Sequence, residues 1–325
     1  MKVLVLHSDV PPDAPPEDQD TLIAARAVCD ALRLNDYQAT LAPFAPDRDA
    51  LAALLGEQQP DVVFNLVEGI GGKGNLAYLA PQLLDELGVR YTGTGAEALI
   101  VTGDKPRTKR LLRNAELPTP AWAEPPHWEG LVPGRWPERW IVKCADEDAS
   151  IGLDDGAVVE AEAVPARAED CAARYGGVWF SEQFVDGREF NIAVVEGLGI
   201  PRVLPMAEMT FADWPAGRPR IVGYVAKWDE ASFESVKTVR KFGVEDDEPE
   251  LAAKLRNLCE QAWLLLGCRG TARIDFRVDS EGNPLVLEVN PNPGIAPDAG
   301  LVAAAAEAGL CYADLIARIV EEAMR

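Results

Sequence analysis

The chain has 325 residues, enough for two or three domains, and 48% of them are hydrophobic, as in globular proteins. Its net charge of −22 disfavours nucleic acid and anionic membranes as partners. The six cysteines form no Cys-x-x-Cys pair and there are two histidines, which disfavours zinc, redox and Ser-His-Asp chemistry. The N-terminal apolar run is too short for a signal peptide, and no run reaches roughly 18 apolar residues, so we expect a cytoplasmic protein.

The first hundred residues alternate between strand, loop and helix patterns. Val3–Leu6 and Val62–Leu66 are short apolar runs of the kind found in buried parallel strands. Between them, apolar residues at helical spacing predict a helix that begins after a cap at Asp20. The glycine-rich segment 68–75 follows the second strand, and it fits a ligand-binding loop and a plain strand-to-helix turn equally well. This alternation predicts an α/β domain with a parallel sheet over residues 1–100.

The amino-acid composition changes after residue 116, where a Pro- and Trp-rich stretch begins. Trp140–Lys143 and Trp179–Val185 predict strands, and the polar segment 146–156 between them predicts a loop. We therefore place a small central domain at 101–186 and an α+β C-terminal domain at 187–325. The C-terminal domain is predicted to hold strands at 190–195 and 203–211, a helix at 251–265, a hairpin at 272–291 and helices at 301–308 and 312–324.

The most informative segment is the predicted hairpin, whose turn we place at 281–282. With that turn, Asp275 lies opposite Glu288 and Arg273 lies opposite Asn290, and all four side chains share one face. Directly opposed carboxylates destabilise a sheet, so a positive charge is expected between them. Two carboxylates and an amide oxygen form a hard oxygen site that suits Mg²⁺ shared with phosphates. A solvated polar face on an edge hairpin is the alternative.

Three lysines stand out by their context. Lys105 lies at the start of a predicted helix, Lys143 ends an apolar strand, and Lys227 lies between aromatic residues. Each is compatible with an ordinary surface lysine, and Lys143 fits that description least because two apolar strand residues precede it. Lysines of this kind would give a phosphate ligand the basic pocket it needs inside an acidic surface. No Gly-x-x-x-x-Gly-Lys-Ser/Thr loop occurs, so the chain is not a P-loop nucleotide protein.

Several short motifs follow one another along the chain in an order that is known from one protein superfamily. They are Lys143, Ser150-Ile151-Gly152, Glu182–Val185, Gly187–Phe190, Ala226–Trp228, Arg273–Asp275 and Glu288–Gly294. Over essentially its whole length the chain resembles the ATP-grasp superfamily and, within it, the D-alanine–D-alanine ligases. The resemblance implies a three-part fold with ATP between the central and C-terminal domains. It also implies an ADP-forming ligase that joins a carboxylate to an amine through an acyl phosphate.

The resemblance assigns a role to each matched position. The implied nucleotide-binding residues are Lys105, Lys143, Lys227, Glu189 and the adenine-contacting strand Glu182, Gln183, Phe184 and Val185. The implied ligands of two Mg²⁺ ions, with Mn²⁺ as an alternative, are Asp275, Glu288 and Asn290. The implied catalytic groups are Arg273, Gly294, Lys227 and Ser150, of which Ser150 lies in a loop that closes over the site.

The resemblance fails where the substrates would bind. Segment 7–12 replaces the Ser-x-Glu-x-x-Val signature of the ligases, whose glutamate binds the ammonium of the first substrate. Trp228 stands where a tyrosine is expected. Ala299-Gly300, or residues near them, replace the Ser-Leu pair that binds the carboxylate of the second substrate in the ligases, and Asp298 lies beside them. Asp298 would repel a carboxylate and favour an amine. The candidates for a substitute ammonium partner stay open: Glu17, Asp18 and Asp20.

The sequence therefore predicts a ligase for small amino-acid-like substrates that differ from the standard D-alanine pair. Three alternatives stay open: a D-alanine–D-alanine ligase proper, an ATP-dependent kinase-like enzyme or non-peptide ligase on the same scaffold, and a nucleotide-binding protein without ligase activity. The complete acidic hairpin argues against the last of these. We expect no nucleic-acid or membrane partner, and the sequence leaves a homodimer open.

Overall fold

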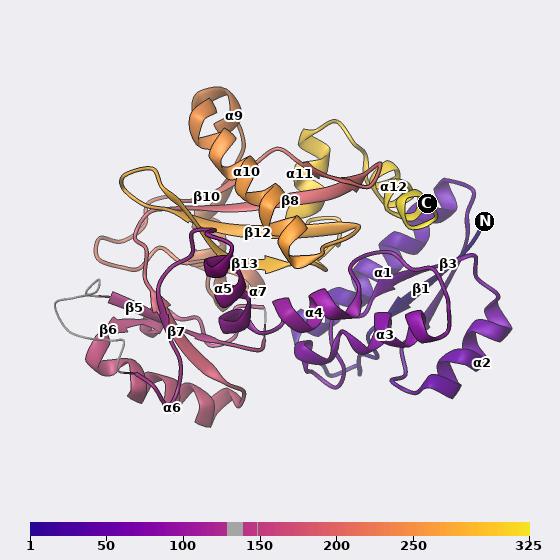
Figure 1. Ribbon diagram of the computed structural model, residues 1–325, viewed down its shortest axis with the longest axis horizontal. Helices are drawn as coiled ribbons and strands as arrows, with labels where there is room; N and C mark the ends of the chain where they lie inside the picture. Colours follow the sequence, from indigo (N-terminus) through magenta and orange to yellow (C-terminus); the bar gives the residue numbers. More distant parts are fainter. Residues whose placement is uncertain (129–138, 148) are drawn as a thin grey trace.

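The protein is described by a computed structural model that covers residues 1–128, 139–147 and 149–325, without the side chain of Glu17. Part of the Pro- and Trp-rich stretch noted above lies outside these residues. The strands form three sheets, and each occupies its own stretch of the chain (Figure 1). This mixture of a parallel N-terminal sheet with two antiparallel sheets and flanking helices confirms the predicted α/β and α+β class.

The first sheet is parallel, with strand order β2-β1-β3, as the alternating pattern predicts. Its elements are β1 (Lys2–His7), α1 (Pro16–Leu34), β2 (Gln38–Pro43), α2 (Arg48–Gln58), β3 (Val62–Leu66) and α3 (Leu79–Glu86). β2 was not predicted, because it is an edge strand with two buried residues among six. The predicted cap at Asp20 was wrong, since α1 begins at Pro16, a residue type that fits the first helical turn.

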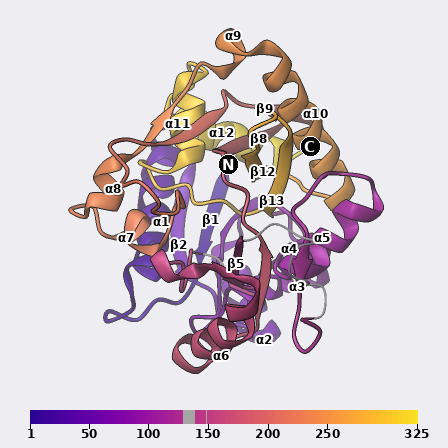
Figure 2. The same cartoon turned by 90° about the vertical axis from the view of Figure 1, so that its left-hand side faces the viewer.

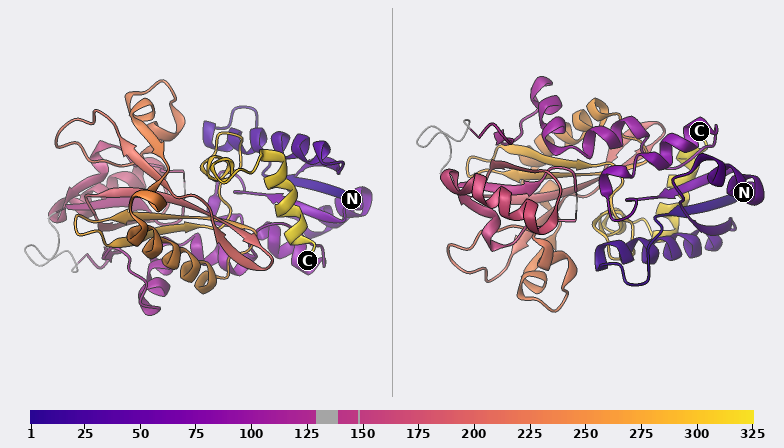
Figure 3. Two further views of the ribbon diagram at one scale, coloured as in Figure 1. Left: turned by 90° about the horizontal axis from the view of Figure 1, so that it is seen from above. Right: turned by 90° about the horizontal axis from the view of Figure 1, so that it is seen from below.

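The last two helices pack against this first sheet and also against the strand Arg188–Gly197 of a later sheet. α11 (Gly300–Glu307) and α12 (Tyr312–Ala323) share a buried core with α1 and with the apolar face of β1 and β3. Figure 3 shows α12 lying beside the N-terminal region, far along the colour scale from it. The loop between β13 (Pro284–Asn290) and α11 therefore crosses from one part of the molecule to another at the cleft.

The second sheet is antiparallel, with order β4-β7-β5-β6, and α6 covers its outer side (Figure 2). Its elements are β4 (Trp122–Ala123), β5 (Arg139–Cys144), β6 (Val158–Glu160), α6 (Val164–Tyr175) and β7 (Trp179–Gln183). Trp140, Val142 and Trp179 form its core with α6. Because side chains alternate along β5, Lys143 points to the side opposite this core.

The third sheet is the largest, with order β11-β10-β8-β12-β13 and β9 paired to β8. The predicted single strand at 203–211 was wrong, because the chain leaves the sheet between β9 and β10. Its strands are β8 (Arg188–Gly197), β9 (Ile200–Val203), β10 (Ala207–Phe211), β11 (Thr238–Lys241), β12 (Thr271–Val278) and β13 (Pro284–Asn290). The other helices are α4 (Ala96–Thr102), α5 (Lys105–Asn114), α7 (Tyr224–Trp228), α8 (Phe233–Lys237), α9 (Val244–Asp247) and α10 (Pro249–Leu266).

The hairpin of β12 and β13 has the predicted register at the end distant from its turn. It reaches that register through a bulge that the sequence did not reveal. Asp275 pairs with Glu288 and Arg273 pairs with Asn290, as predicted. Nearer the turn, however, Phe276 pairs with Val286, so the strands are offset by one residue there. A bulge at Leu287 restores the predicted pairing, and bulges of this kind are common beside functional sites.

Among the described residues, no single helix is both long and apolar enough to span a membrane. α11 and α12 together reach that length and composition, but they meet at 103° and lie in the core described above.

Candidate active site

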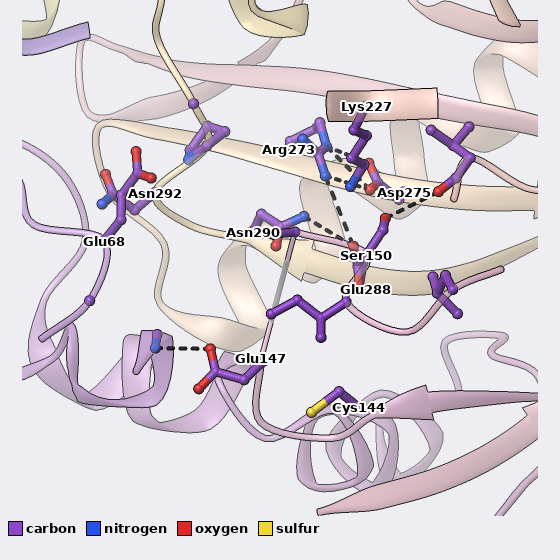
Figure 4. A pocket seen from close by; sticks show the side chains of 18 of the residues that line it. Glu68, Cys144, Glu147, Ser150, Lys227, Arg273, Asp275, Glu288, Asn290 and Asn292 are labelled. Carbon is purple, nitrogen blue, oxygen red and sulfur yellow. Dashed lines mark hydrogen bonds and ion pairs between the residues drawn. The ribbon is translucent and has the colours of Figure 1, made fainter. Parts of the chain in front are cut away.

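A cleft of about 1070 Å³ lies between the three sheets. Residues from the N-terminal region, from the loop after β5 and from the inner face of the large sheet line it. Every residue with a role implied by the resemblance contributes to this one cleft: Lys105, Lys143, Ser150, Glu182, Gln183, Phe184, Val185, Glu189, Lys227, Arg273, Asp275, Glu288, Asn290 and Gly294. Lys227 approaches the hairpin from α7 (Figure 4).

The two facing carboxylates of the hairpin lie among positive charges, as their repulsion requires. Arg273 binds Asp275 with two hydrogen bonds of 2.8 Å, and its Nη2 lies 3.9 Å from Glu288. Lys105 Nζ lies 3.9 Å from the other oxygen of Glu288. Burial opposes ionisation of Glu288, but Lys105, Lys143, Lys227 and Arg273 outweigh it and lower its pKa to about 2. Burial raises the pKa of Asp275, although Arg273 opposes that shift.

The donor set at the end of the hairpin fits a hard cation. Asn290 donates its amide N–H to Glu288 at 3.4 Å, which leaves the amide oxygen of Asn290 for a ligand. Together with Asp275, these residues offer carboxylate and carbonyl oxygens, the ligands that Mg²⁺ prefers. The described residues contain no group of three or more Asp, Glu, His or Cys side chains arranged to hold a metal unaided. Such a site suits a cation that also binds substrate phosphates, which is how Mg²⁺ is usually held.

A second charged group lies deeper in the cleft. Glu182 is 1% exposed, and its two oxygens each lie 2.5 Å from a lysine, Lys109 on one side and Lys143 on the other. Burial opposes ionisation of Glu182, but the two lysines lower its pKa. Burial lowers the pKa of Lys109, and pairing with Glu182 only partly offsets that effect. Glu182 thus fixes Lys143 at the wall of the cleft. Sequence reasoning missed this role of Lys109, because a lysine inside a basic helix looks like a surface residue.

The resemblance assigns the adenine contact to the backbone of residues 182–185. Two of these backbone N–H groups already form hydrogen bonds within the protein. The N–H of Gln183 donates to the carbonyl of Ala121, and the N–H of Phe184 donates to the carbonyl of Arg139. Phe184 is 7% exposed, and Arg139 lies 4.9 Å from its ring centre. The strand is therefore rigid where it borders the cleft.

Glu189, the implied ribose ligand, is held by a partner that the sequence did not indicate. Arg277 lies beside it on β12, with Nη2 2.8 Å from the Glu189 carboxylate. The same guanidinium donates to the carbonyls of Gly187 and Arg220. Arg277 is 4% exposed, so this is a buried ion pair of fixed geometry. One carboxylate oxygen remains for a hydroxyl ligand.

The loop after β5 is tied to the segment that carries Lys227. Ser150 donates its hydroxyl to the carbonyl of Val222 at 3.1 Å, and the indole N–H of Trp228 donates to the carbonyl of Ala149 at 3.1 Å. Ala149 and Ser150 both have positive φ angles, a costly conformation for residues with a side chain. Trp228 lacks the tyrosine hydroxyl, yet it closes the loop through a different donor.

The opposite end of the cleft is bordered by the N-terminal region. Ser8 accepts hydrogen bonds from the backbone of Glu68 and Gly69, which positions the glycine-rich loop, and Thr21 donates to the Glu68 carboxylate at 3.2 Å. Two of the three acidic candidates, Asp18 and Asp20, line this end, while the side chain of Glu17 lies outside the described part. Glu68 is a further carboxylate here that sequence reasoning missed; Figure 4 shows it beside Asn292.

Comparison with solved structures shows that the chain has the fold of D-alanine–D-alanine ligases of known structure. A D-alanine–D-alanine ligase from Bacillus anthracis, solved in complex with ATP, superposes with a TM-score of 0.75 over 100% of this chain and 98% of that one. The two sequences are 20% identical, so this match concerns the fold.

Sequence relatives identify the family. A family model described as the D-ala D-ala ligase C-terminus matches residues 136–321. A D-alanine–D-alanine ligase of Sphingopyxis alaskensis is 30% identical over 95% of this chain and 94% of its own length. An uncharacterized protein of Sinorhizobium fredii, y4sG, is 31% identical over 97% of this chain and 90% of its own. The chain belongs to the D-alanine–D-alanine ligase family, and it is an enzyme of the ADP-forming C–N ligase class.

Proposed function

We propose that this protein joins the carboxylate of one amino-acid-like substrate to the amine of another, with an acyl phosphate as intermediate. The observation that carries the proposal is the Asp275–Glu288 pair, ringed by cations within a single large cleft. This arrangement brings a triphosphate and a carboxylate together despite a net charge of −22 on the chain.

The proposed roles follow from the contacts of each side chain. Lys105 and Lys143 neutralise phosphate charge, since Glu288 and Glu182 hold them at the wall of the cleft. Asp275, Glu288 and Asn290 would hold Mg²⁺, which would supply positive charge that offsets the negative charge of the phosphates. Lys227 reaches the terminal phosphates from α7.

The nucleotide base and sugar are assigned to the adjoining strands. Because Gln183 and Phe184 already donate their N–H groups, we assign the adenine contact to the backbone at Val185. Glu189 binds the ribose hydroxyls, and its bond to Arg277 fixes its orientation.

The reaction proceeds in two steps. The carboxylate oxygen of the first substrate attacks the γ-phosphorus of ATP, and ADP leaves. The amine of the second substrate then attacks the acyl carbon, phosphate leaves, and the amine loses a proton. Arg273, fixed by Asp275, and the backbone at Gly294 donate to the oxyanion that develops in the second step. The Ser150 loop excludes the water that would hydrolyse an acyl phosphate.

We further propose that the substrates differ from the D-alanine pair. Trp228 replaces a tyrosine, and Ala299-Gly300 replaces a Ser-Leu pair. The acidic residues that line the N-terminal end of the cleft include Asp18, Asp20 and Glu68. A second candidate function is D-alanine–D-alanine ligation itself, which the names of the relatives favour.

Phosphate and ADP release in the presence of amino-acid pairs tests both levels of this proposal. Stimulation by a pair of amino acids, with the amide product found by mass spectrometry, supports ligation, and no stimulation by any pair refutes it. Robust formation of D-alanyl-D-alanine by the wild-type enzyme favours the second candidate. Trp228→Tyr alone should leave D-alanine ligation weak. Strong activity of that variant would show that Trp228 alone sets the substrate.

A further inference from the structure

We propose that Lys109 and Thr119 are positioning residues for Glu288, the implied metal ligand, and that they act by holding the bulge of β13 in place. The inference deepens the proposed ligase function, on which its activity readout rests. It gives a role to two residues that are not among the described residues lining the cleft.

The bulge at Leu287 decides which side chain of β13 lies opposite Asp275. Phe276 pairs with Val286, so regular antiparallel pairing beyond that point would bring Leu287 opposite Asp275. The extra residue brings Glu288 there instead. Without the bulge, Glu288 would point to the other face of the sheet, because successive side chains alternate. The metal site therefore depends on what holds the strand at Val286.

A short segment on the outer edge of β13 holds Val286. β13 is the last strand of its sheet, so the backbone groups on its outer side need partners from elsewhere. The N–H of Val286 donates to the carbonyl of Pro118 at 2.8 Å, and the carbonyl of Val286 accepts a hydrogen bond from the hydroxyl of Thr119 at 2.8 Å. Both backbone groups of the residue beside the bulge are thus fixed from outside the sheet.

Lys109 orients the hydroxyl of Thr119. Its ammonium group donates to Thr119 Oγ1 at 2.8 Å and lies 2.5 Å from the carboxylate of Glu182. A hydroxyl has one proton to donate, so a bond accepted from the ammonium leaves that proton for the carbonyl of Val286. The charged donor also polarises the hydroxyl and strengthens the bond that it donates. A chain of contacts therefore runs from Glu182 through Lys109 and Thr119 to the bulge.

Burial of Lys109 is unfavourable by itself, which indicates a role beyond stability. Its side chain is 1% exposed, and burial lowers its pKa, while the charges of Glu182 and, more weakly, Glu288 oppose that shift. Apolar side chains in place of a whole buried ion pair often leave stability unchanged or raise it. What such a pair supplies is a fixed geometry for its neighbours. Here the neighbours are Lys143, which also binds Glu182, and the strand that carries Glu288.

The direct test compares two threonines whose hydroxyl groups each donate to a backbone carbonyl at 2.8 Å. Thr119→Val removes the bond to Val286, and Thr108→Val, the matched control in the same region, removes a bond to Val101. Titration of Mn²⁺ in the presence of ATP, followed by electron paramagnetic resonance, measures the metal site. Thr119→Val should weaken Mn²⁺ binding about 3- to 10-fold, the usual effect of losing one hydrogen bond. Thr108→Val and the conservative variant Thr119→Ser should bind Mn²⁺ as the wild type does.

Two results of this titration would overturn the proposal. One is an unchanged Mn²⁺ affinity in Thr119→Val. The other is an equal loss of affinity in Thr119→Val and Thr108→Val, which would mean that any buried hydroxyl of this region has the same effect.

A second test needs neither metal nor substrate. Hydrogen–deuterium exchange, measured by mass spectrometry on the free protein, reports how often β13 opens. In Thr119→Val, a peptide that covers residues 284–290 should exchange about 3- to 10-fold faster than in the wild type, because Val286 has lost one of its two outer bonds. Thr108→Val should leave this peptide unchanged. Equal exchange in Thr119→Val and the wild type would show that the hydroxyl does not hold the bulge.

The effect of Thr119→Val should depend on Lys109 if the two residues act in one chain of contacts. In a Lys109→Gln background no charged donor orients the hydroxyl, so adding Thr119→Val should weaken Mn²⁺ binding by less than about 2-fold further. Lys109→Arg keeps the charge but displaces the donor, and it gives a second background if Lys109→Gln does not fold. An equal effect of Thr119→Val with and without Lys109 would refute the role of Lys109.

The activity readout separates positioning from general destabilisation. In Thr119→Val, the Mg²⁺ concentration for half-maximal ADP release should rise about 3- to 10-fold, and saturating Mg²⁺ should restore kcat. A lower kcat that saturating Mg²⁺ does not restore would contradict positioning of the metal ligand. If no amino-acid pair stimulates ADP release, the ligase proposal fails separately, and the Mn²⁺ and exchange measurements still decide the role of Lys109 and Thr119.

Discussion

The two ends of the cleft differ in whether their buried polar groups have partners within the protein. At the nucleotide end, Glu182 is paired with two lysines, and Asp275 is paired with Arg273. At the substrate end, Arg240 and Thr238 of β11 line the cleft, and the described residues give the Arg240 guanidinium and the Thr238 hydroxyl no partner. The two buried carboxylates at the first end have their counter-charges within the protein, whereas the guanidinium and the hydroxyl at the second end have no partner among the described residues.

This difference explains why the motifs locate the nucleotide end and leave the substrate end open. Both members of a buried ion pair must be kept for the chain to fold, because loss of one member leaves a buried charge without a partner. Unpaired groups in a cleft are constrained by the ligand alone, and they can differ between relatives that share a fold. The following predictions test this contrast, beginning with the largest expected effect.

Glu288→Ala should reduce Mg²⁺-dependent ADP release by more than about 1000-fold, since the variant loses a metal ligand at the reacting phosphate. Far-UV circular dichroism and the unfolding transition should show that the fold is retained. Turnover at the wild-type rate would remove Glu288 from the metal site.

Glu182→Gln should destabilise the protein by about 3–5 kcal/mol, because Lys109 and Lys143 would lose their buried counter-charge. Urea unfolding at pH 7 measures the change. Glu208→Gln is the control: its partner, Arg188, is more exposed, and the loss should be about 1 kcal/mol or less. Equal losses in the two variants would contradict the special role of the deep pair.

The stability advantage of the wild type over Glu182→Gln should depend on pH. The folded pKa of Glu182 lies below its ordinary value of 4.5, so the carboxylate stabilises the fold above pH 4.5. That contribution is lost as the pH falls from 4.5 toward the folded pKa. Urea unfolding of both proteins between pH 7 and pH 3 should therefore show the gap narrowing below pH 4.5. A gap independent of pH would mean that the carboxylate is not the stabilising group.

The smallest expected effect concerns the closing loop. Trp228→Phe and Ser150→Ala each remove one hydrogen bond worth about 1 kcal/mol, so acyl phosphate hydrolysis should rise a few-fold relative to amide formation. The ratio of phosphate released to amide formed measures this leak. Trp214→Phe loses a comparable indole bond, to the carbonyl of Pro219, at a residue that does not line the cleft, and its ratio should stay near one. A similar ratio in all three variants would mean that the hydrogen bonds of Trp228 and Ser150 do not control the exclusion of water from the site.

The fold was largely predictable because its strands and helices carry strong periodic patterns, and the exceptions have physical reasons. Edge strand β2 buries two residues of six and gives no apolar run. The site register of the hairpin was predicted correctly although the pairing near the turn is offset, since the bulge at Leu287 compensates. The packing of α12 on α1 joins the two ends of the chain, a contact that no local pattern reveals.

The residues of the candidate site also differ in whether the sequence predicted them. Asp275 and Glu288 could be found from the sequence because two facing acids in a hairpin need an explanation. Arg240 could not, because the basic strand around it resembles an exposed surface strand until its neighbours in space are known. Arg277 was missed for the same reason, since its partner lies on another strand.

The central claim is that Asp275 and Glu288 share bound cations with a nucleotide, and a titration of Mn²⁺ followed by electron paramagnetic resonance tests it most directly. With ATP present, the wild-type protein should bind two Mn²⁺ ions per chain, and Glu288→Gln should bind fewer and more weakly. Nucleotide-dependent Mn²⁺ binding that is unchanged in this variant, or absent from the wild type, would contradict the account.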